Sequence, residues 1–332
     1  MISNPDIYYS RQYGSLYEQV EEGVFGSFIF KSECGNVKNG YIKRQIKQKI
    51  DGKSYYDIIT PYGYGGPVIQ VECDDIDRKE LAERYHKEFQ NFCRDNRIVD
   101  EFIRFHPLLE NARDWENLYD VQFNRNTLAI NVRDNNYRST QFSSKCRNSL
   151  RKAMKMGVVV EVDENCANLE DFMSLYYMTM DKNHADSYYY FPKTYFYSIK
   201  SSLKSGVILV NALLENKIIA SSIFILGNEY IHYHLSATNP KYYSFAANNM
   251  IIDAAAEYGH LQNYRWLHLG GGISRGQDDN LFKFKQQFAR QSQNLKSFYT
   301  GFYVYLDDIY HHLCSLSSNL HANADYFPAY RG

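Results

Sequence analysis

The sequence predicts an α+β fold of two domains, each with a mixed, mostly antiparallel central sheet. The chain has 332 residues, and because an ordinary domain has about 150 residues, two domains are expected. Strand-like and helix-like stretches alternate in the first half, whereas three strand-like segments follow one another in the second half. We place the boundary in the charged stretch 133–144, which gives domains of residues 1–137 and 138–332.

The first half contains four expected strands and one expected helix. The strands are expected over residues 26–31, 55–60, 98–105 and 127–132. A loop rich in glycine and proline, 61–67, follows the second of these strands and is expected to turn the chain. Within 78–96, apolar side chains recur every three or four residues, which predicts an amphipathic helix.

The second half is expected to place helices ahead of an antiparallel meander. Periodicity predicts helices over 144–156, with Leu150 and Met154 on the apolar face, and over 169–182. The meander strands are expected over residues 207–214, 218–226 and 230–236, after a first strand over 158–162. A helix over residues 248–258, ended by Gly259, and a short strand over 266–269 are expected next.

Composition argues against several classes of function. The 37 basic residues balance 38 acidic ones, so no overall field attracts nucleic acid or a membrane surface. The longest apolar runs are far shorter than the roughly 20 residues of a membrane span, and the N-terminus lacks a signal-peptide pattern. We therefore expect a cytoplasmic protein. Its six cysteines form no C-x-x-C pair, which predicts reduced thiols rather than a zinc site or disulfides.

The segment 269–288 has the most informative pattern. A short strand ends in Gly270-Gly-Gly272, a polar loop follows, and Asp278 or Asp279 is expected to cap a new helix. On that helix Lys285 shares a face with apolar side chains. Two interpretations follow. Either Lys285 stabilises an oxyanion or a carboxylate at a reaction centre, or its stem packs while its ammonium group reaches solvent.

This segment resembles the closing signature of the FemAB-like family, whose members add amino acids to cell-wall peptides. Three earlier segments resemble that family in the same order. They are the loop Ile59–Val68, the basic segment Lys145–Gly157, and Thr179-Met-Asp-Lys182 at the family's threonine-x-x-arginine position. The resemblance covers approximately residues 20–305.

The resemblance implies two tandem acetyltransferase-like (GNAT-like) domains, with the acceptor in a cleft between or beside them. It places Phe284 and Lys285 at the acyl-transfer site, and Lys182 where the family's arginine contacts a phosphorylated acceptor. Lysine keeps the charge of that arginine but not its forked geometry, which leaves the acceptor open. Aminoacyl-tRNA is the implied donor, and a nucleotide- or lipid-linked cell-envelope precursor is the implied acceptor.

Other residues are expected to contact substrate. Arg147, Arg151 and Lys155 form a basic stripe that suits the phosphates of a nucleotide-linked acceptor or of tRNA, with a solvated helix face as the alternative. His232 and His234 face one side of a strand and are expected to line the site rather than bind metal. The remaining candidates are Tyr233, His268, Gly271 and Tyr64.

We therefore expect an N-acyltransferase that forms an amide bond without a metal or redox cofactor. Acyl-CoA enzymes of the acetyltransferase fold bind pyrophosphate on a glycine-spaced loop after the central strand, and the matching residues 236–248 contain no glycine. Acyl-CoA is accordingly the alternative co-substrate to aminoacyl-tRNA. A non-catalytic module that binds glycan or peptide is the alternative outside enzymes, and the oligomeric state is open.

Overall fold

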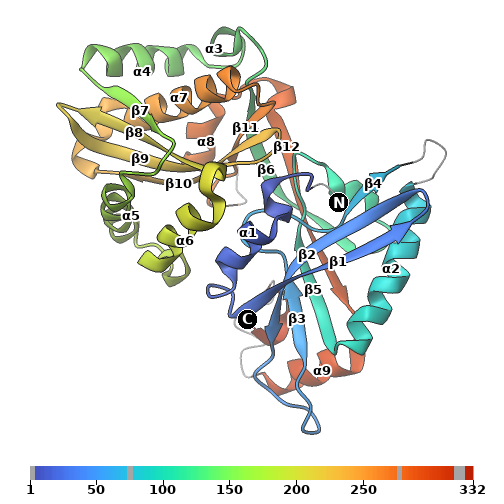
Figure 1. The fold of residues 1–332 in the computed structure, drawn as a ribbon. Coiled ribbons are helices and arrows are strands. Elements are labelled where there is room, and N and C mark those ends of the chain that lie inside the picture. The colour runs from blue at the N-terminus through green and yellow to red at the C-terminus, as the bar shows by residue number, and fades with distance from the viewer. Residues whose placement is uncertain (1–3, 73–77, 275–278, 318–325, 332) are drawn as a thin grey trace. The chain divides into compact units, whose positions relative to one another are not determined.

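A computed structural model of the protein describes residues 4–72, 78–274, 279–317 and 326–331. The chain divides into two compact units (Figure 1). Unit 1 comprises Met1–Ile7 and Asn126–Lys296, and unit 2 comprises Tyr8–Arg125 and Ser297–Gly332. Each unit therefore combines segments from different parts of the chain.

These units do not coincide with the predicted division into residues 1–137 and 138–332. Strand β6 (Asp120–Asn131) was expected to end the first domain, but its second part pairs with β11 (Trp266–Gly270) and belongs to unit 1. Strand β12 (Leu295–Val304) runs from unit 1 into unit 2, where it pairs with β5 (Ile98–Arg104). Periodicity within one segment cannot reveal such pairing between distant segments.

The sheet of unit 1 has the strand order β6-β11-β10-β9-β8-β7. Its further strands are β7 (Val159–Asp163), β8 (Val207–Leu214), β9 (Lys217–Leu226) and β10 (Tyr230–Thr238). Neighbouring strands are antiparallel except β10 and β11, which are parallel. The expected meander is confirmed, and Glu215 and Asn216 form its first turn with positive φ angles, as a two-residue hairpin turn requires.

Helices cover both faces of this sheet (Figure 1). The apolar core of unit 1 lies between one face and the helices α4 (Ser144–Lys155), α7 (Ala247–Leu261) and α8 (Asn280–Gln286). The opposite face is covered by α5 (Leu169–Asn183) and α6 (Lys193–Leu203). The short helix α3 (Tyr137–Thr140) precedes α4.

Two sequence-based details of the helices are wrong. Gly259 does not end its helix, because α7 continues to Leu261. A side chain at Gly259 would press against Ile231 and Val132, so glycine here lets α7 pack closely on the sheet. Met154 was expected on the buried face of its helix but is 54% exposed, and Ala153 is buried instead.

The sheet of unit 2 has the order β1-β2-β3-β5-β12, with β4 paired to β2. The new strands are β1 (Gly23–Ser32), β2 (Gly35–Gln45), β3 (Tyr56–Ile59) and β4 (Val68–Val71). Its helices are α1 (Arg11–Gly14), α2 (Arg78–Asp95) and α9 (Asp307–Leu316). Ile98 packs in the core beneath α2, whereas its neighbour Val99 packs with α9, so β5 is buried on both faces.

Glu101 of β5 is a buried carboxyl group within unit 2. It accepts hydrogen bonds from Asn39 Nδ2 at 2.8 Å and from the Tyr305 hydroxyl at 2.6 Å. Burial raises the pKa of Glu101 to about 7, although these hydrogen bonds oppose the rise. The carboxyl is thus held near the midpoint of its titration at neutral pH.

Two further expectations concern cysteines and membranes. Cys34, Cys93, Cys146, Cys166 and Cys314 are free thiols, and Cys73 lies outside the described residues. Within the described ranges, each helix is too short or too polar to cross a lipid bilayer.

Candidate active site

Asp279, the residue that caps α8, holds the described residues 271–274 that follow β11. Its Oδ1 accepts from the Phe282 N–H at 2.8 Å, and its Oδ2 accepts from the Ser274 N–H at 2.6 Å and hydroxyl at 3.2 Å. Burial alone would raise the pKa of this carboxyl, but hydrogen bonds from the loop and from Phe282 outweigh burial and lower it. Of the two caps expected, Asp279 is the one used; Asp278 lies outside the described residues.

Lys285 is buried on α8, with only 7% of its surface exposed. Its Nζ donates to the carbonyl oxygen of Gly271 at 2.7 Å and lies 5.6 Å from the ring centroid of Tyr233. Burial lowers the pKa of Lys285 to about 8, and the nearby Asp279 carboxylate opposes that shift. The expected burial is confirmed, and the alternative in which the ammonium reaches solvent is wrong. Three predicted residues, Lys285, Gly271 and Tyr233, therefore lie together.

Phe284 precedes Lys285 on α8 and packs against the core of unit 1. Its ring lies 5.7 Å from that of Phe288, which is fully buried. Because these rings hold α8 on the sheet, they also fix the position of the neighbouring Lys285.

Strands β10 and β11 pair over only three residues each. The last pair is His232 with His268, after which β10 continues to Thr238 and shifts register between Tyr233 and Leu235. Tyr233 lies on the face of the sheet that carries the core of unit 1, as does Lys285. The pairing thus stops beside the residues that surround the Lys285 ammonium.

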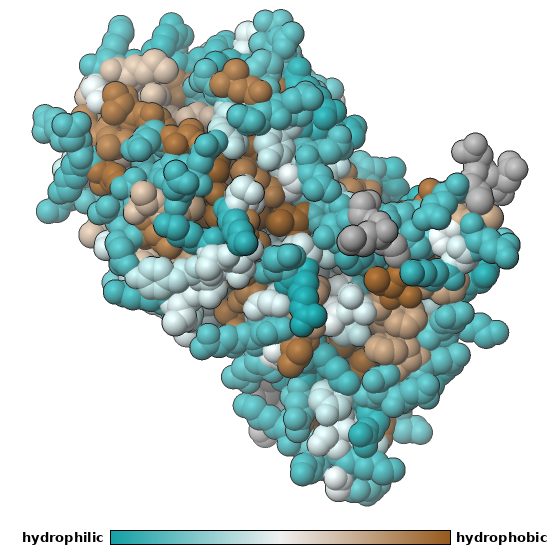
Figure 2. Space-filling view, viewed as in Figure 1, coloured by the Kyte–Doolittle hydropathy of each residue, from teal (hydrophilic) through white to brown (hydrophobic). Residues whose placement is uncertain are grey.

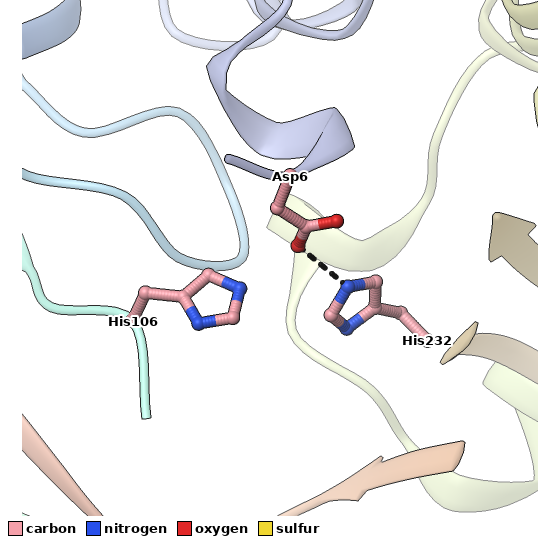
Figure 3. A group of neighbouring side chains, drawn as sticks. All are labelled: Asp6, His106 and His232. Carbon is pink, nitrogen blue, oxygen red and sulfur yellow. Dashed lines mark hydrogen bonds and ion pairs between the residues drawn. The ribbon is translucent and has the colours of Figure 1, made fainter. Parts of the chain in front are cut away.

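The three candidate histidines lie on the opposite face of the sheet from Lys285. His232 bonds the Asp6 carboxylate at 2.7 Å (Figure 3), and its ring lies 5.6 Å from that of His268. His234 bonds the Tyr195 hydroxyl of α6 at 2.9 Å. Burial, with a smaller effect of His232, lowers the pKa of His234 to about 3, so this imidazole is neutral. The structure therefore does not place these histidines beside Lys285.

The sequence gave no indication of two residues that bond these histidines, Asp6 and Thr127. Asp6 lies in the N-terminal segment, 226 residues before His232. His268 bonds the Thr127 hydroxyl at 3.0 Å, across 141 residues. No local pattern could have predicted either pair.

Lys182 lies exposed at the end of α5. Its Nζ is 3.8 Å from the ring centroid of Tyr243, in the segment that joins β10 to α7. In the same motif, the Thr179 hydroxyl accepts from the Thr238 N–H at 3.1 Å and so ties α5 to the end of β10. Tyr243 was not predicted, and the glycine-free stretch offered no reason to choose it.

Two residues of the expected basic stripe on α4, Arg147 and Arg151, have different surroundings in the structure. The Arg147 guanidinium donates to the backbone carbonyl oxygens of Phe142, Arg138 at 3.4 Å and Ser139 at 3.5 Å. These hydrogen bonds tie α4 to α3. Arg151 is exposed and bonds the Asn148 side chain of its own helix. Arg151 is therefore accessible to a ligand, whereas Nη1 of Arg147 is used by the fold.

Tyr64 lies in unit 2, in the loop between β3 and β4. Its ring packs edge-on against those of Tyr8, His106 and Phe298. Burial raises the pKa of its hydroxyl. The tyrosine is thus part of an aromatic cluster within unit 2.

Residues 140–286 match the family model described as an acetyltransferase (GNAT) domain. The crystal structure of FemX aligns over 93% of this chain and 95% of its own, with a TM-score of 0.69 and 11% identity. The chain has the fold of FemX. The predicted resemblance to the FemAB-like family is confirmed at the level of the fold, and so is the tandem GNAT-like, α+β fold class.

The FemX fold is shared by further solved structures. That of L-PGS from Bacillus licheniformis covers 86% of this chain and 90% of its own, at 11% identity and a TM-score of 0.53. A tandem GNAT protein from the clavulanic acid biosynthesis pathway covers 85% and 83%, at 8% identity and a TM-score of 0.50. No curated protein matches the chain by sequence. Within this FemX fold, residues 140–286 contain the candidate site residues except Tyr64.

Proposed function

We propose that this protein is an N-acyltransferase that moves an aminoacyl group from aminoacyl-tRNA to the amine of a cell-envelope peptide or glycan precursor in the cytoplasm. The observation that carries the proposal is the buried Lys285 ammonium beside Gly271 and Tyr233. The likeness of the fold to FemX and the match to a GNAT domain support the transfer of an acyl group. The glycine-free segment 236–248 favours a donor other than acyl-CoA.

The reaction needs no covalent enzyme intermediate, because the ester of an aminoacyl-tRNA is already activated. The acceptor amine attacks the ester carbonyl, the new C–N bond forms and the C–O bond to the ribose breaks. One proton leaves the amine, and the released ribose hydroxyl gains one. An ammonium group has three donors, of which the Gly271 carbonyl takes one. The other two suit the carbonyl oxygen as it becomes negative, a role worth roughly 3 to 4 kcal/mol in comparable sites.

A transfer assay with charged tRNA and amine acceptors tests this proposal. Lys285→Ala should lower kcat by about 10²- to 10³-fold while the circular dichroism spectrum stays unchanged. Lys283→Ala, an exposed lysine of the same helix, is the matched control and should keep full activity. Equal turnover of the two variants would remove Lys285 from the mechanism. No product with any donor would favour a non-catalytic binding module.

The second candidate is an acyl-CoA-dependent N-acyltransferase. The match to an acetyltransferase domain and the likeness to a tandem GNAT protein favour it. Calorimetry with acetyl-CoA separates the two candidates, since the aminoacyl-tRNA proposal predicts no binding. Saturable binding together with acetylated product would replace the first proposal with the second.

A further inference from the structure

Helix α4 presents four exposed cationic side chains on one face. They are Lys145, Arg151, Lys152 and Lys155. Residues three, four or seven positions apart lie above one another on a helix, so these side chains form one band. The buried face of the helix consists of Cys146, Leu150 and Ala153.

The charge of this band is not balanced locally. Helix α4 contains no acidic residue. Among the residues that the structure describes, none of the four cations takes part in an ion pair. Two acids of α7, Asp253 and Glu257, are already paired with Arg138. The band therefore keeps its positive field in a chain whose net charge is −1.

In helix α2, by contrast, exposed cations are balanced by acids of the same helix. The two kinds of residue are interleaved, as in the pairs Lys79–Glu83 and Arg84–Glu80. The first turn of α4 has a cation, Lys145, and no acid, whereas the first turn of α2 includes the acid Glu80. A cation at this end is opposed by the helix dipole, so helix stability does not account for it.

We propose that this face of α4 binds the phosphate backbone of the tRNA donor, an inference that rests on the proposed function. From Lys145 to Lys155 the helix rises about 15 Å. A nucleotide diphosphate places its charge on two adjacent phosphates, whereas an RNA backbone repeats that charge along such a length. The centre of the face is Asn148, and Met154 at its flank is the exposed large apolar side chain of the helix. This composition suits phosphates better than the apolar layer of a membrane.

The band also connects to the proposed acyl-transfer site within unit 1. The N–H of Ser143, which caps α4, donates to the carbonyl oxygen of Gln287 at 2.7 Å, directly after α8. The rings of Phe142 and Phe288 pack edge to face with centroids 5.2 Å apart. RNA bound along α4 would therefore contact an element fixed to the helix that carries Lys285.

Fluorescence anisotropy with labelled, uncharged bulk tRNA tests the inference. With four phosphate contacts, the logarithm of the binding constant should fall with the logarithm of KCl concentration at a slope of about −3. The quadruple variant K145A/R151A/K152A/K155A should bring this slope close to zero and weaken binding at least about tenfold at roughly 50 mM salt. Alanine favours a helix, so the variant should fold. The charge-matched control K79A/R84A/K87A/R94A changes four exposed cations of α2 and should keep the wild-type slope.

Three outcomes would overturn the inference. The first is an unchanged salt slope in the α4 variant, and the second is an equal loss of tRNA affinity in the α2 control. The third is an α4 variant that no longer binds anionic lipid vesicles but still binds tRNA as the wild type does. The aminoacyl-transfer assay is read separately. If transfer is absent but tRNA binding depends on α4, the proposed function fails and the RNA surface stands. If transfer proceeds with an unchanged KM for tRNA in the α4 variant, the surface fails alone.

Discussion

The ammonium group of Lys285 donates a hydrogen bond of 2.7 Å to the carbonyl oxygen of Gly271. This bond joins α8 to Gly271, directly after β11, and the Asp279 carboxylate holds Ser274 three residues further along. Contacts within the chain itself thus position a charged donor and the backbone around it. Such preorganisation is what a group needs to stabilise charge that develops during a reaction.

The proposed role of Lys285 predicts how turnover depends on pH. Burial lowers the pKa of Lys285 to about 8, so the ammonium loses its proton as the pH rises above that value. If the charged form is needed, kcat should fall about tenfold per pH unit above pH 8. Lys285→Arg keeps its charge to much higher pH and should move this fall beyond the measurable range. A pH profile of kcat that is flat to pH 10 in the wild type would contradict the role.

Gly272 and Asp279 should depend on each other energetically. A methyl group at position 272 would overlap the Asp279 carboxylate, which three hydrogen bonds hold in place. Gly272→Ala should therefore displace the cap of α8, and Asp279→Ala should remove it, each at a cost of about 1 to 2 kcal/mol. The double variant should be little worse than either single variant. Chemical denaturation of the four proteins measures the coupling, and strict additivity would refute it.

Glu101 should make unit 2 less stable as the pH rises. Its folded pKa of about 7 exceeds its ordinary value of 4.5, so the stabilising effect is complete below pH 4.5 and is lost as the pH passes 7. The loss should be on the order of 3 kcal/mol. Trp115, buried in unit 2, reports unfolding by fluorescence in a Trp266→Phe background. Glu101→Gln should change the difference between pH 5 and pH 8 by about this amount, and an unchanged difference would assign it to other groups of unit 2.

The bond between Asp6 and His232 should stabilise unit 1. Asp6→Ala leaves a buried imidazole without its carboxylate and should cost about 1 to 3 kcal/mol. Lys217→Ala, which removes an exposed side chain of unit 1, is the control. Fluorescence of Trp266 in a Trp115→Phe background follows unit 1. Equal unfolding midpoints for Asp6→Ala and the wild type would show that the bond between Asp6 and His232 does not stabilise unit 1.

Local periodicity was enough to predict many elements. Helix α2 and the meander β8–β10 have regular apolar spacing, and their bounds agree with the expected ranges to within a few residues. The same spacing placed Lys285 on a buried face. In these segments the residues that a helix or strand buries are apolar, so the pattern is visible in the sequence.

Strand β2 and helix α6 were missed for physical reasons. Strand β2 buries polar side chains, since Asn39 pairs with Glu101 and Asn36 with Glu72, and such burial leaves no alternation of apolar residues. Helix α6 contains three adjacent aromatic residues, 195–197, in its first half, and these suit a strand equally well. Lys285 and the three histidines lie on opposite faces of the sheet. Which face a side chain occupies depends on strand pairing between distant segments, so the sequence could not separate these residues.

The exchange of chain segments between the units has a consequence for synthesis. Unit 2 contains Tyr8–Arg125, but α9 and most of β12, which complete its sheet and the core around Val99, follow unit 1 in the sequence. The ribosome releases the whole of unit 1 before it releases these elements. Tyr8–Arg125 are therefore synthesised before most of unit 1, yet unit 2 can complete its sheet only after unit 1 has been synthesised.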